Sequence, residues 1–371
     1  MIPLSQPTID EQEEKVVLDV LRSGRLSLGP YLTRFEEEFA KLIGVTHAVG
    51  VNSGTSGLHL CVKSLGIGRG DEVITSPFSF IASANCILYE GAKPVFVDIE
   101  EETFNIDPKL VGEAVTDDTK AILPVHVFGQ CCDMGQIMGI AEKKGFKVIE
   151  DACESIGSTH KGGKAGSFGD ASVFAFYPNK QMTTGEGGMI VTDDDDVARL
   201  CKSYSNQGRA TDMQWLNHER IGYNYRMGEI NAAIGCAQLD KLDHLLERRK
   251  KIAKLYSEGL EDVSGLILPK IKKGNDHTWF VYPLRVEDGI GRDKMISKLA
   301  DKGVSSKAYF FPAIHLQPFY MKEFGYNEGD FPVAEKVSKS TFILPLFAGL
   351  DEDSIGKVIK AVIECLREVS D

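Results

Sequence analysis

A lysine in a glycine-rich turn is the strongest candidate for chemistry in this sequence. Lys180 follows an apolar run at 171–176 and precedes the glycines of 185–188, after which a second apolar run continues to residue 192. A lysine that forms an imine must lose its proton, and burial or a neighbouring cationic group lowers its pKa toward that state. The segment therefore predicts an imine-forming lysine. On spacing alone, a lysine that merely follows a strand is an equally good interpretation.

An aspartate at the end of another apolar run is the second candidate. Asp151 follows the predicted strand 147–150, and ligands of open α/β sheets gather outside the carboxyl ends of the strands. A carboxylate at that edge could keep a pyridine nitrogen protonated, which would make the ring an electron sink. The alternative is an aspartate that caps a helix.

The turn 52–57, Asn-Ser-Gly-Thr-Ser-Gly, is a candidate phosphate site. It follows a predicted strand and opens a predicted helix, so the backbone N–H groups and hydroxyls of Gly54, Thr55 and Ser56 could receive an anion at the positive end of the helix dipole. Serine and glycine also simply cap helices, and the turn alone does not decide between the two interpretations.

An aromatic side chain could stack on a cofactor ring from the segment 76–80. Phe80 lies just past the predicted strand 72–75 and is the preferred candidate. Two alternatives stay open: Phe78 could be the stacking residue instead, or both rings could simply pack in the core.

Alternating strands and helices must position these residues. Strand and helix periodicities follow each other in βαβ order, which predicts an α/β fold with a mostly parallel central sheet covered by helices. The expected strands are 48–51, 72–75, 94–97, 121–125, 147–150, 171–176 and 188–192, and the expected helices are 10–22, 31–43, 56–65, 81–89 and 134–144.

The pattern changes after residue 231. A long amphipathic stretch passes through Leu239, Leu242 and Leu245 into the basic run 248–251, and a mixed pattern follows, with a strand expected at 279–286 and helices at 292–302 and 353–369. Because 371 residues exceed what one core usually organises, we expect a large cofactor-binding domain over 1–245 and a smaller α+β domain over 246–371.

Composition excludes several classes of protein. A net charge of −12 argues against a nucleic-acid or anionic-membrane partner, since such surfaces need a basic stripe. Eight cysteines without CxxC spacing predict reduced thiols and no metal site. Residues 1–7 carry no basic segment followed by an apolar run, so we expect a cytoplasmic protein.

Taken in this order, the residues resemble the DegT/DnrJ/StrS-type sugar aminotransferases, a branch of the fold-type-I pyridoxal-phosphate enzymes. A nucleotide-binding dehydrogenase would need GxGxxG after the first strand, which 52–57 does not match. The matching blocks cover nearly the whole chain: 29–30 with 35–36, 52–60, 79–85, 94–98, 124–126, 150–152, 180–188 and 222–227.

The resemblance implies a role for each candidate. Lys180 would hold pyridoxal 5'-phosphate as an imine, Asp151 would pair with the pyridinium nitrogen, and Phe80 would stack on the ring. Gly54, Thr55 and Ser56 would form the phosphate site, Glu154 would lie beside the cofactor where many members carry glutamine, and Asn224 would reach the phosphate of the neighbouring subunit's cofactor. A homodimer with shared active sites follows, with Arg226 near its interface.

Two positions depart from the family's pattern. Ala175 stands where members often place a serine that touches the phosphate. The segment 307–315 looks like the substrate-facing loop, with Tyr309 and His315 as further substrate candidates, but it carries Lys307 where arginine is frequent. His126 and His315 are interpreted as structural or substrate-positioning residues, because a released Lys180 can itself shuttle the proton.

The reaction implied is amino transfer from L-glutamate to a nucleoside-diphosphate-linked keto-sugar, for surface polysaccharide or secondary metabolite synthesis. Gln214-Trp215 and Asp133-Met134 look closest to perosamine-synthase-like members, which aminate a 4-keto-6-deoxy sugar. A sugar dehydratase is the rival within the fold, although known relatives of that kind carry histidine in place of the lysine. A non-catalytic cofactor-binding regulator is the rival of another class.

Overall fold

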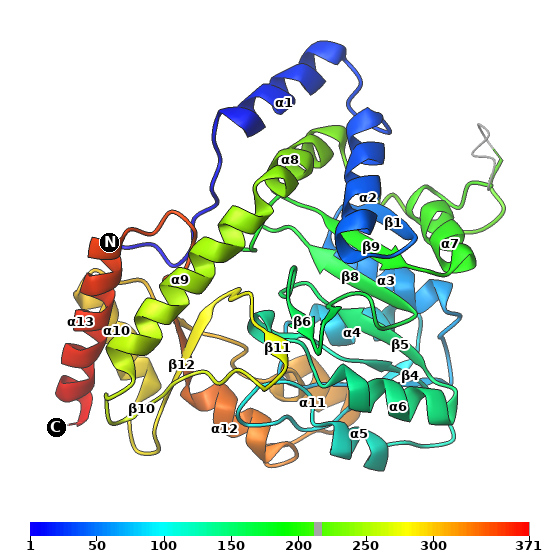
Figure 1. The fold of residues 1–371 in the computed structure, drawn as a ribbon. Helices are drawn as coiled ribbons and strands as arrows, with labels where there is room; N and C mark the ends of the chain where they lie inside the picture. The colour runs from blue at the N-terminus through cyan, green and yellow to red at the C-terminus, as the bar shows by residue number, and fades with distance from the viewer. Residues whose placement is uncertain (211–216, 371) are drawn as a thin grey trace.

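A computed structural model gives the fold and describes residues 1–210 and 217–370 (Figure 1). Its central feature is a seven-stranded sheet in the order β1-β9-β8-β5-β4-β2-β3. β9 runs antiparallel to both its neighbours, whereas the pairs from β8 to β3 are parallel, which confirms the predicted fold class. The strands are β1 (His47–Val51), β2 (Glu72–Thr75), β3 (Lys93–Phe96), β4 (Thr119–Leu123), β5 (Lys147–Asp151), β8 (Ala171–Ala175) and β9 (Gly188–Thr192).

Helices cover both faces of this sheet because successive strand residues point to opposite sides. Val173 of β8 packs with the helices α3, α4 and α7, whereas the next residue, Phe174, packs with α2 and α8. Toward β2, the second face is covered by α5 and α6. These helices are α2 (Pro30–Ile43), α3 (Gly54–Ser64), α4 (Ala82–Tyr89), α5 (Pro108–Glu113), α6 (Met134–Lys144), α7 (Asp195–Ser205) and α8 (Glu229–Asp240).

The C-terminal part builds a second sheet with its own core. Its four antiparallel strands, in the order β10-β12-β14-β13, are β10 (Leu266–Ile267), β12 (Tyr282–Val286), β13 (Lys307–Ala308) and β14 (Thr341–Leu344). The helices of this part are α9 (Leu242–Leu260), α10 (Arg292–Asp301), α11 (Pro318–Phe324), α12 (Pro332–Ser340) and α13 (Glu352–Ser370). The boundary near residue 245 stays a prediction, and α9 runs through that position without a break.

A third small sheet joins the two parts. β11 (Asn275–Asp276) pairs with β6 (Thr159–His160), which pairs with β7 (Gly163–Lys164). Short 3-10 turns lie at η1 (Val127–Gly129) and η2 (Ile314–Leu316).

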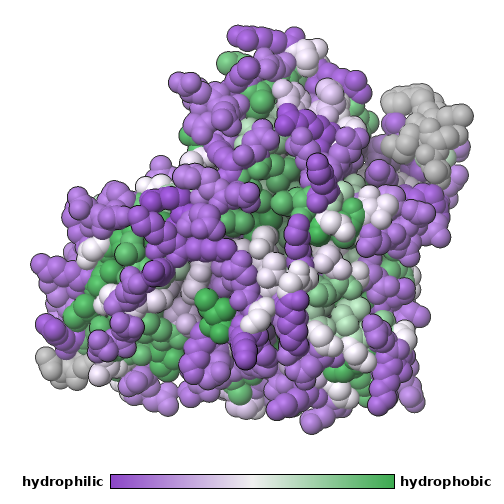
Figure 2. All heavy atoms as spheres, viewed as in Figure 1, coloured by the Kyte–Doolittle hydropathy of each residue, from purple (hydrophilic) through white to green (hydrophobic). Residues whose placement is uncertain are grey.

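Helix α1 (Glu11–Ser23) projects at the top of the molecule and packs on α8 (Figure 1). It begins with a capping box formed by Asp10 and Glu13, which satisfies N–H groups that a helix start leaves free. The surface seen in Figure 2 is mostly hydrophilic, with apolar side chains gathered in the hollow below this helix. Among the described residues, no helix combines the length and apolarity that crossing a membrane requires.

Three expectations need comment. The strand expected from 279 begins only at Tyr282, because Trp279 adopts a positive φ of 55° and the N–H groups of Thr278 and Phe280 bond to the loop 128–129 instead. The amphipathic stretch after 231 forms two helices, α8 and α9, that meet at Lys241. Gln214 and Trp215 lie outside the described residues.

Candidate active site

A cavity of about 570 Å³ opens at the carboxyl ends of the parallel strands. Its size suits a cofactor or small substrate. Asp151 at the end of β5 and Ala175 at the end of β8 lie in its wall, together with the first residues of α3. Among the residues lining it are eight of the candidate binding and catalytic residues: Gly54, Thr55, Phe80, Asp151, Glu154, Lys180, Lys307 and Tyr309.

Lys180 reaches this cavity from the loop between β8 and β9, as the sequence predicts. Its N–H donates to the carbonyl of Tyr177, which closes a turn and orients the side chain. The Nζ atom lies 4.1 Å from the ring centroid of the buried Phe280 and 3.5 Å from Oε1 of Glu154. The amine is thus largely removed from water and lies at the cavity wall, where it could meet an electrophilic carbon of a bound ligand.

Asp151 is fixed by two donors. Its Oδ2 accepts a 2.7 Å hydrogen bond from the hydroxyl of Ser83, and its Oδ1 accepts the N–H of Cys153 at 3.1 Å. The side chain is 5% exposed, and no helix begins at this position. The helix-capping alternative is therefore wrong, and the carboxylate is held at the cavity wall by bonds that leave lone pairs for a ligand.

The turn 52–57 opens α3 as expected, with Ser53 as its N-cap. Gly54 and Thr55 line the cavity, so N–H groups at the start of an 11-residue helix face it. Ser56 does not line the cavity, since its hydroxyl donates to Oδ1 of Asn52 at 2.6 Å. Its phosphate role stays a prediction. Ala175 lies against Gly54, where a Cβ would come within 2.8 Å of the alanine methyl, so this wall is tightly packed.

The structure separates the two phenylalanines. Phe80 lines the cavity and is 64% exposed, whereas Phe78 is fully buried beside Phe104 and Phe128. A large aromatic face left open at a cavity is a suitable stacking surface for a flat ring, which favours Phe80.

Glu154 is a buried carboxyl group beside Lys180. Burial raises its pKa, although the charge of Lys180 and the N–H of Phe128, 2.9 Å from Oε2, oppose that shift. Glu154 and Lys180 therefore form a buried ion pair at the cavity, with Nζ 3.5 Å from Oε1.

Besides Ser56 and Arg226, three candidates lie outside the cavity wall. His315 is fully buried and contacts Glu335 at 3.1 Å, whereas His126 is fully buried and lies 2.9 Å from Glu150. Both agree with a structural role. Asn224 is exposed on the segment that follows Tyr223, and no atom of it lines the cavity of its own chain.

Sequence reasoning missed several residues of the wall. Ser83, Cys153, Tyr177 and Asn179 all line the cavity. Tyr177 and Asn179 flank Lys180, and that proximity was a usable signal. Ser83 lies 68 positions from Asp151, and nothing in the local pattern announces their contact.

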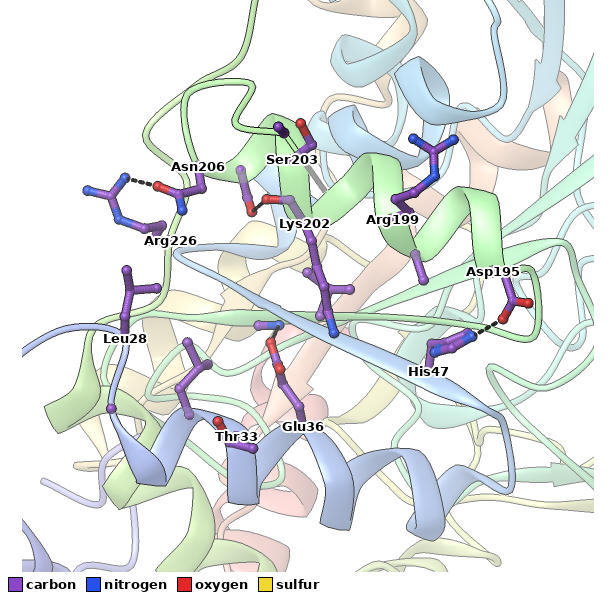
Figure 3. Close-up of a pocket in the computed structure, with 17 residues that line it drawn as sticks. Leu28, Thr33, Glu36, His47, Asp195, Arg199, Lys202, Ser203, Asn206 and Arg226 are labelled. Atoms are coloured by element: carbon purple, nitrogen blue, oxygen red, sulfur yellow. Dashed lines mark hydrogen bonds and ion pairs between the residues drawn. The ribbon is translucent and has the colours of Figure 1, made fainter. Parts of the chain in front are cut away.

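A second hollow of about 440 Å³ lies between α2 and α7 (Figure 3). Its wall includes Glu36, Lys202 and Arg226, and the guanidinium of Arg226 donates to Oδ1 of Asn206. Burial raises the pKa of Glu36 to about 7, although the N–H of Gly50 bonds to the carboxyl. Of the candidate site residues, only Arg226 lines this hollow, so the candidates gather at the first cavity.

Residues 7–363 match the DegT/DnrJ/EryC1/StrS aminotransferase family. The chain belongs to this family. Its members include relatives similar over almost their whole length. The spore coat polysaccharide biosynthesis protein SpsC of Bacillus subtilis is 41% identical, covering 99% of this chain and 97% of the relative, and the GDP-perosamine synthase of Caulobacter vibrioides is 38% identical, covering 98% of each. The resemblance seen in the sequence is confirmed, and the chain is an aminotransferase-family enzyme.

The PLP form of Spr1654 from Streptococcus pneumoniae superposes with a TM-score of 0.94 at 30% identity, covering 99% of each chain. This supports, at the level of the family, the pyridoxal phosphate expected from the sequence. The cavity fits that group: an amine, a carboxylate, an open aromatic face and a helix N-terminus converge on one space of suitable volume.

Proposed function

We propose that this chain is a pyridoxal-phosphate-dependent aminotransferase that transfers an amino group from L-glutamate to a nucleoside-diphosphate-linked keto-sugar, with 4-keto-6-deoxy sugars as the first class to test. One observation carries the proposal. Lys180, Asp151 and the N-terminus of α3 face a single cavity, which is the set of groups that a phosphorylated pyridine aldehyde requires.

The cofactor, when bound, supplies an electrophilic carbon for amines and a ring that withdraws electrons. The chain's residues do the rest. The carboxylate of Asp151, held by Ser83 and the N–H of Cys153, keeps a proton on the ring nitrogen. The N–H groups of Gly54 and Thr55 bind the phosphate at the positive end of α3.

Lys180 is the proposed proton carrier. Its side chain is 14% exposed and its Nζ faces the cavity beside Glu154, so Nζ is placed to take up and carry a proton there. Phe80 orients the flat ring, and Lys307 and Tyr309 contribute the wall where the sugar substrate would lie. Lys307 is exposed and cationic, which suits a diphosphate.

A homodimer is part of the proposal. Asn224 is exposed and does not line the cavity of its own chain, which suits a residue that serves a partner's site. The projecting α1 leaves Leu18 and Leu21 about half exposed, at 47% and 50%, an unusual arrangement for a helix that is not covered.

The test is an absorbance titration of the purified protein with pyridoxal phosphate, followed by L-glutamate and then by GDP-, dTDP- or UDP-linked keto-sugars, with the products identified by mass spectrometry. A visible band that shifts with glutamate and returns with one sugar supports the proposal. A band that ignores every amino donor would favour the dehydratase or the regulator, and the absence of a band would refute the cofactor role.

Lys180→Ala provides the matched variant. We expect turnover to fall by roughly 100- to 10,000-fold, because the proton carrier and the point of covalent attachment are both lost. Lys164→Ala, in which an exposed lysine outside the cavity is removed, is the control. Normal turnover by a folded Lys180→Ala protein would show that the assigned role is wrong.

A further inference from the structure

The segment that carries Asn224 is held by the two tyrosines on either side of it. The rings of Tyr223 and Tyr225 stack at 4.8 Å with planes 10° apart, and both pack against His59, at centroid distances of 4.9 Å and 5.9 Å. Both tyrosines are half-buried, whereas Asn224 is exposed. Alternate residues of an extended segment point to opposite sides, so anchoring the tyrosines turns Asn224 outward.

One carboxylate organises the polar side of this anchor. Glu90 follows the end of α4, and its oxygens lie 2.7 Å from Nε2 of His59 and 2.8 Å from Nζ of Lys63, and accept the hydroxyl of Tyr223 at 3.3 Å. With Nε2 as the donor, Nδ1 of the neutral ring accepts the hydroxyl of Tyr225 at 3.3 Å. Glu90 therefore reaches both tyrosines, one directly and one through His59.

The same anchor is tied to the start of α3. His59 and Lys63 lie on that helix, whose first residues line the cavity. Asn52, which directly precedes the N-cap, donates its backbone N–H to the carbonyl of Tyr225 at 2.8 Å and its side-chain amide to the carbonyl of Asn224 at 3.4 Å.

The far end of the segment is fixed as well. Arg226 donates to Oδ1 of Asn206 at 2.8 Å, and short antiparallel bridges join Asn224 to Asn206 and Arg226 to Val51 (Figure 3). The backbone of 223–226 is thus held along one side, and Glu90 holds the side chain of Tyr223 directly and that of Tyr225 through His59.

We propose that Glu90 is a positioning residue that acts through His59, Lys63 and Tyr223 to present Asn224 to the cofactor phosphate of a partner subunit. This rests on the proposed function, in which the site is shared. Neither Glu90 nor any of the three side chains that it contacts lines the cavity of the described chain, so Glu90 can act on the cofactor only through other residues, and the proposal assigns that role to Asn224.

The test compares pyridoxal phosphate with pyridoxal, which lacks the phosphate. Full-length Glu90→Gln and Tyr223→Phe proteins are titrated with each compound, and binding is followed by visible absorbance. We expect about tenfold weaker binding of pyridoxal phosphate and a change within about twofold for pyridoxal, because a hydrogen bond to a charged phosphate is lost. Tyr223→Phe removes only a hydroxyl, so it still tests the proposal if the Glu90→Gln protein folds poorly.

A control and a reference variant make the result decisive. Glu72→Gln removes a carboxylate that pairs with Lys93 and Thr116 at another site. The ratio of the affinity for pyridoxal phosphate to the affinity for pyridoxal should be the same in this variant as in the unchanged protein. Asn224→Ala should reproduce the loss, and adding Glu90→Gln to it should cost little more, since both act through one contact.

The outcomes separate two failures. If Asn224→Ala lowers the affinity for pyridoxal phosphate relative to pyridoxal but neither Glu90→Gln nor Tyr223→Phe does, Glu90 has no positioning role. This inference is then overturned, while the proposed function stands. Equal weakening of both compounds in the Glu90 and Tyr223 variants would also overturn it, since that indicates a general structural role. If Asn224→Ala has no effect, the shared site is wrong and the inference falls with it.

Discussion

At the scale of single residues, the chemistry depends on side chains that do not themselves react. Asp151 was recognisable from its place at the end of a strand, but its orientation comes from Ser83, whose hydroxyl bonds to Oδ2 at 2.7 Å. Sequence periodicity predicts which face or edge a residue occupies. It carries no signal for a contact between a helix and the end of a strand that lie 68 positions apart in the sequence.

Removing the Ser83 hydroxyl tests this orientation. We expect Ser83→Ala to weaken cofactor retention roughly tenfold, which corresponds to about 1.4 kcal/mol, because the carboxylate loses a donor and its fixed direction. Dissociation constants from absorbance titration are the measurement. Ser23→Ala, which removes a hydroxyl on α1 that bonds to Val20, is the control and should leave the constant unchanged.

Glu150, the neighbour of Asp151, has a structural task. It is fully buried and accepts the N–H groups of Gly166, Phe168 and Gly169, the hydroxyl of Ser172 and a bond from His126. Burial alone would raise its pKa, but the bonds from His126 and the backbone outweigh burial and hold the pKa below its ordinary value of 4.5.

The sign of the pH dependence follows from that depressed pKa. The ionised carboxylate stabilises the fold above pH 4.5, and this contribution is lost as the pH falls through the lower value of the folded state. We expect Glu150→Gln to reduce the free energy of unfolding by about 3 kcal/mol or more at pH 7 and by less below pH 4.5. Urea unfolding at both pH values measures this, and a constant difference would contradict it.

At the scale of elements, the site depends on how closely α3 approaches the sheet. Gly57 faces β8, and a Cβ there would lie 2.6 Å from Cγ1 of Val173, a β-branched side chain with little freedom to move. The glycine thus lets α3 lie close to the sheet, and this distance sets the position of Gly54 and Thr55 at the cavity.

Gly57→Ala should therefore lower the free energy of unfolding by about 1–3 kcal/mol. The same change should also weaken cofactor binding. The matched control is Gly139→Ala in α6, where a Cβ would meet no atom within 4 Å. That change should stabilise by about 0.5–1 kcal/mol through the better helix propensity of alanine. Thermal unfolding with and without cofactor measures both, and destabilisation of equal size in the two variants would count against the packing argument.

The elements themselves were largely readable from the sequence, and the exceptions have physical causes. Long periodic runs such as α6 and β9 were predicted to the residue, because local propensity and burial agree there. The predicted strand 121–125 lies at Thr119–Leu123, since Val125 pairs only through an isolated bridge with Asp151. Two-residue strands such as β6 and β13 have no period to detect, because tertiary pairing alone creates them.

At the scale of the whole molecule, strand and helix periodicity predicted the layered α/β architecture, whereas the role proposed for Asn224 in a partner's site came from the family resemblance alone. Asn224 reads as a loop residue when the chain is considered alone. Its exposure, and the anchoring of Tyr223 and Tyr225 on either side of it, support the proposal that a second copy completes the site.

Mixing two defective proteins tests the shared site directly. If Asn224 serves the partner, a hybrid of a Lys180→Ala chain and an Asn224→Ala chain contains one site with both native residues, contributed by different chains. Equal mixing and random reassociation should then make about a quarter of all sites native, so cofactor binding and turnover should recover to about that level. If Asn224 instead serves its own cavity, no site in the hybrid is native, and mixing should restore nothing beyond the activity of the separate variants. Recovery of turnover that increases with the time allowed for subunit exchange would show that it depends on the formation of hybrid dimers.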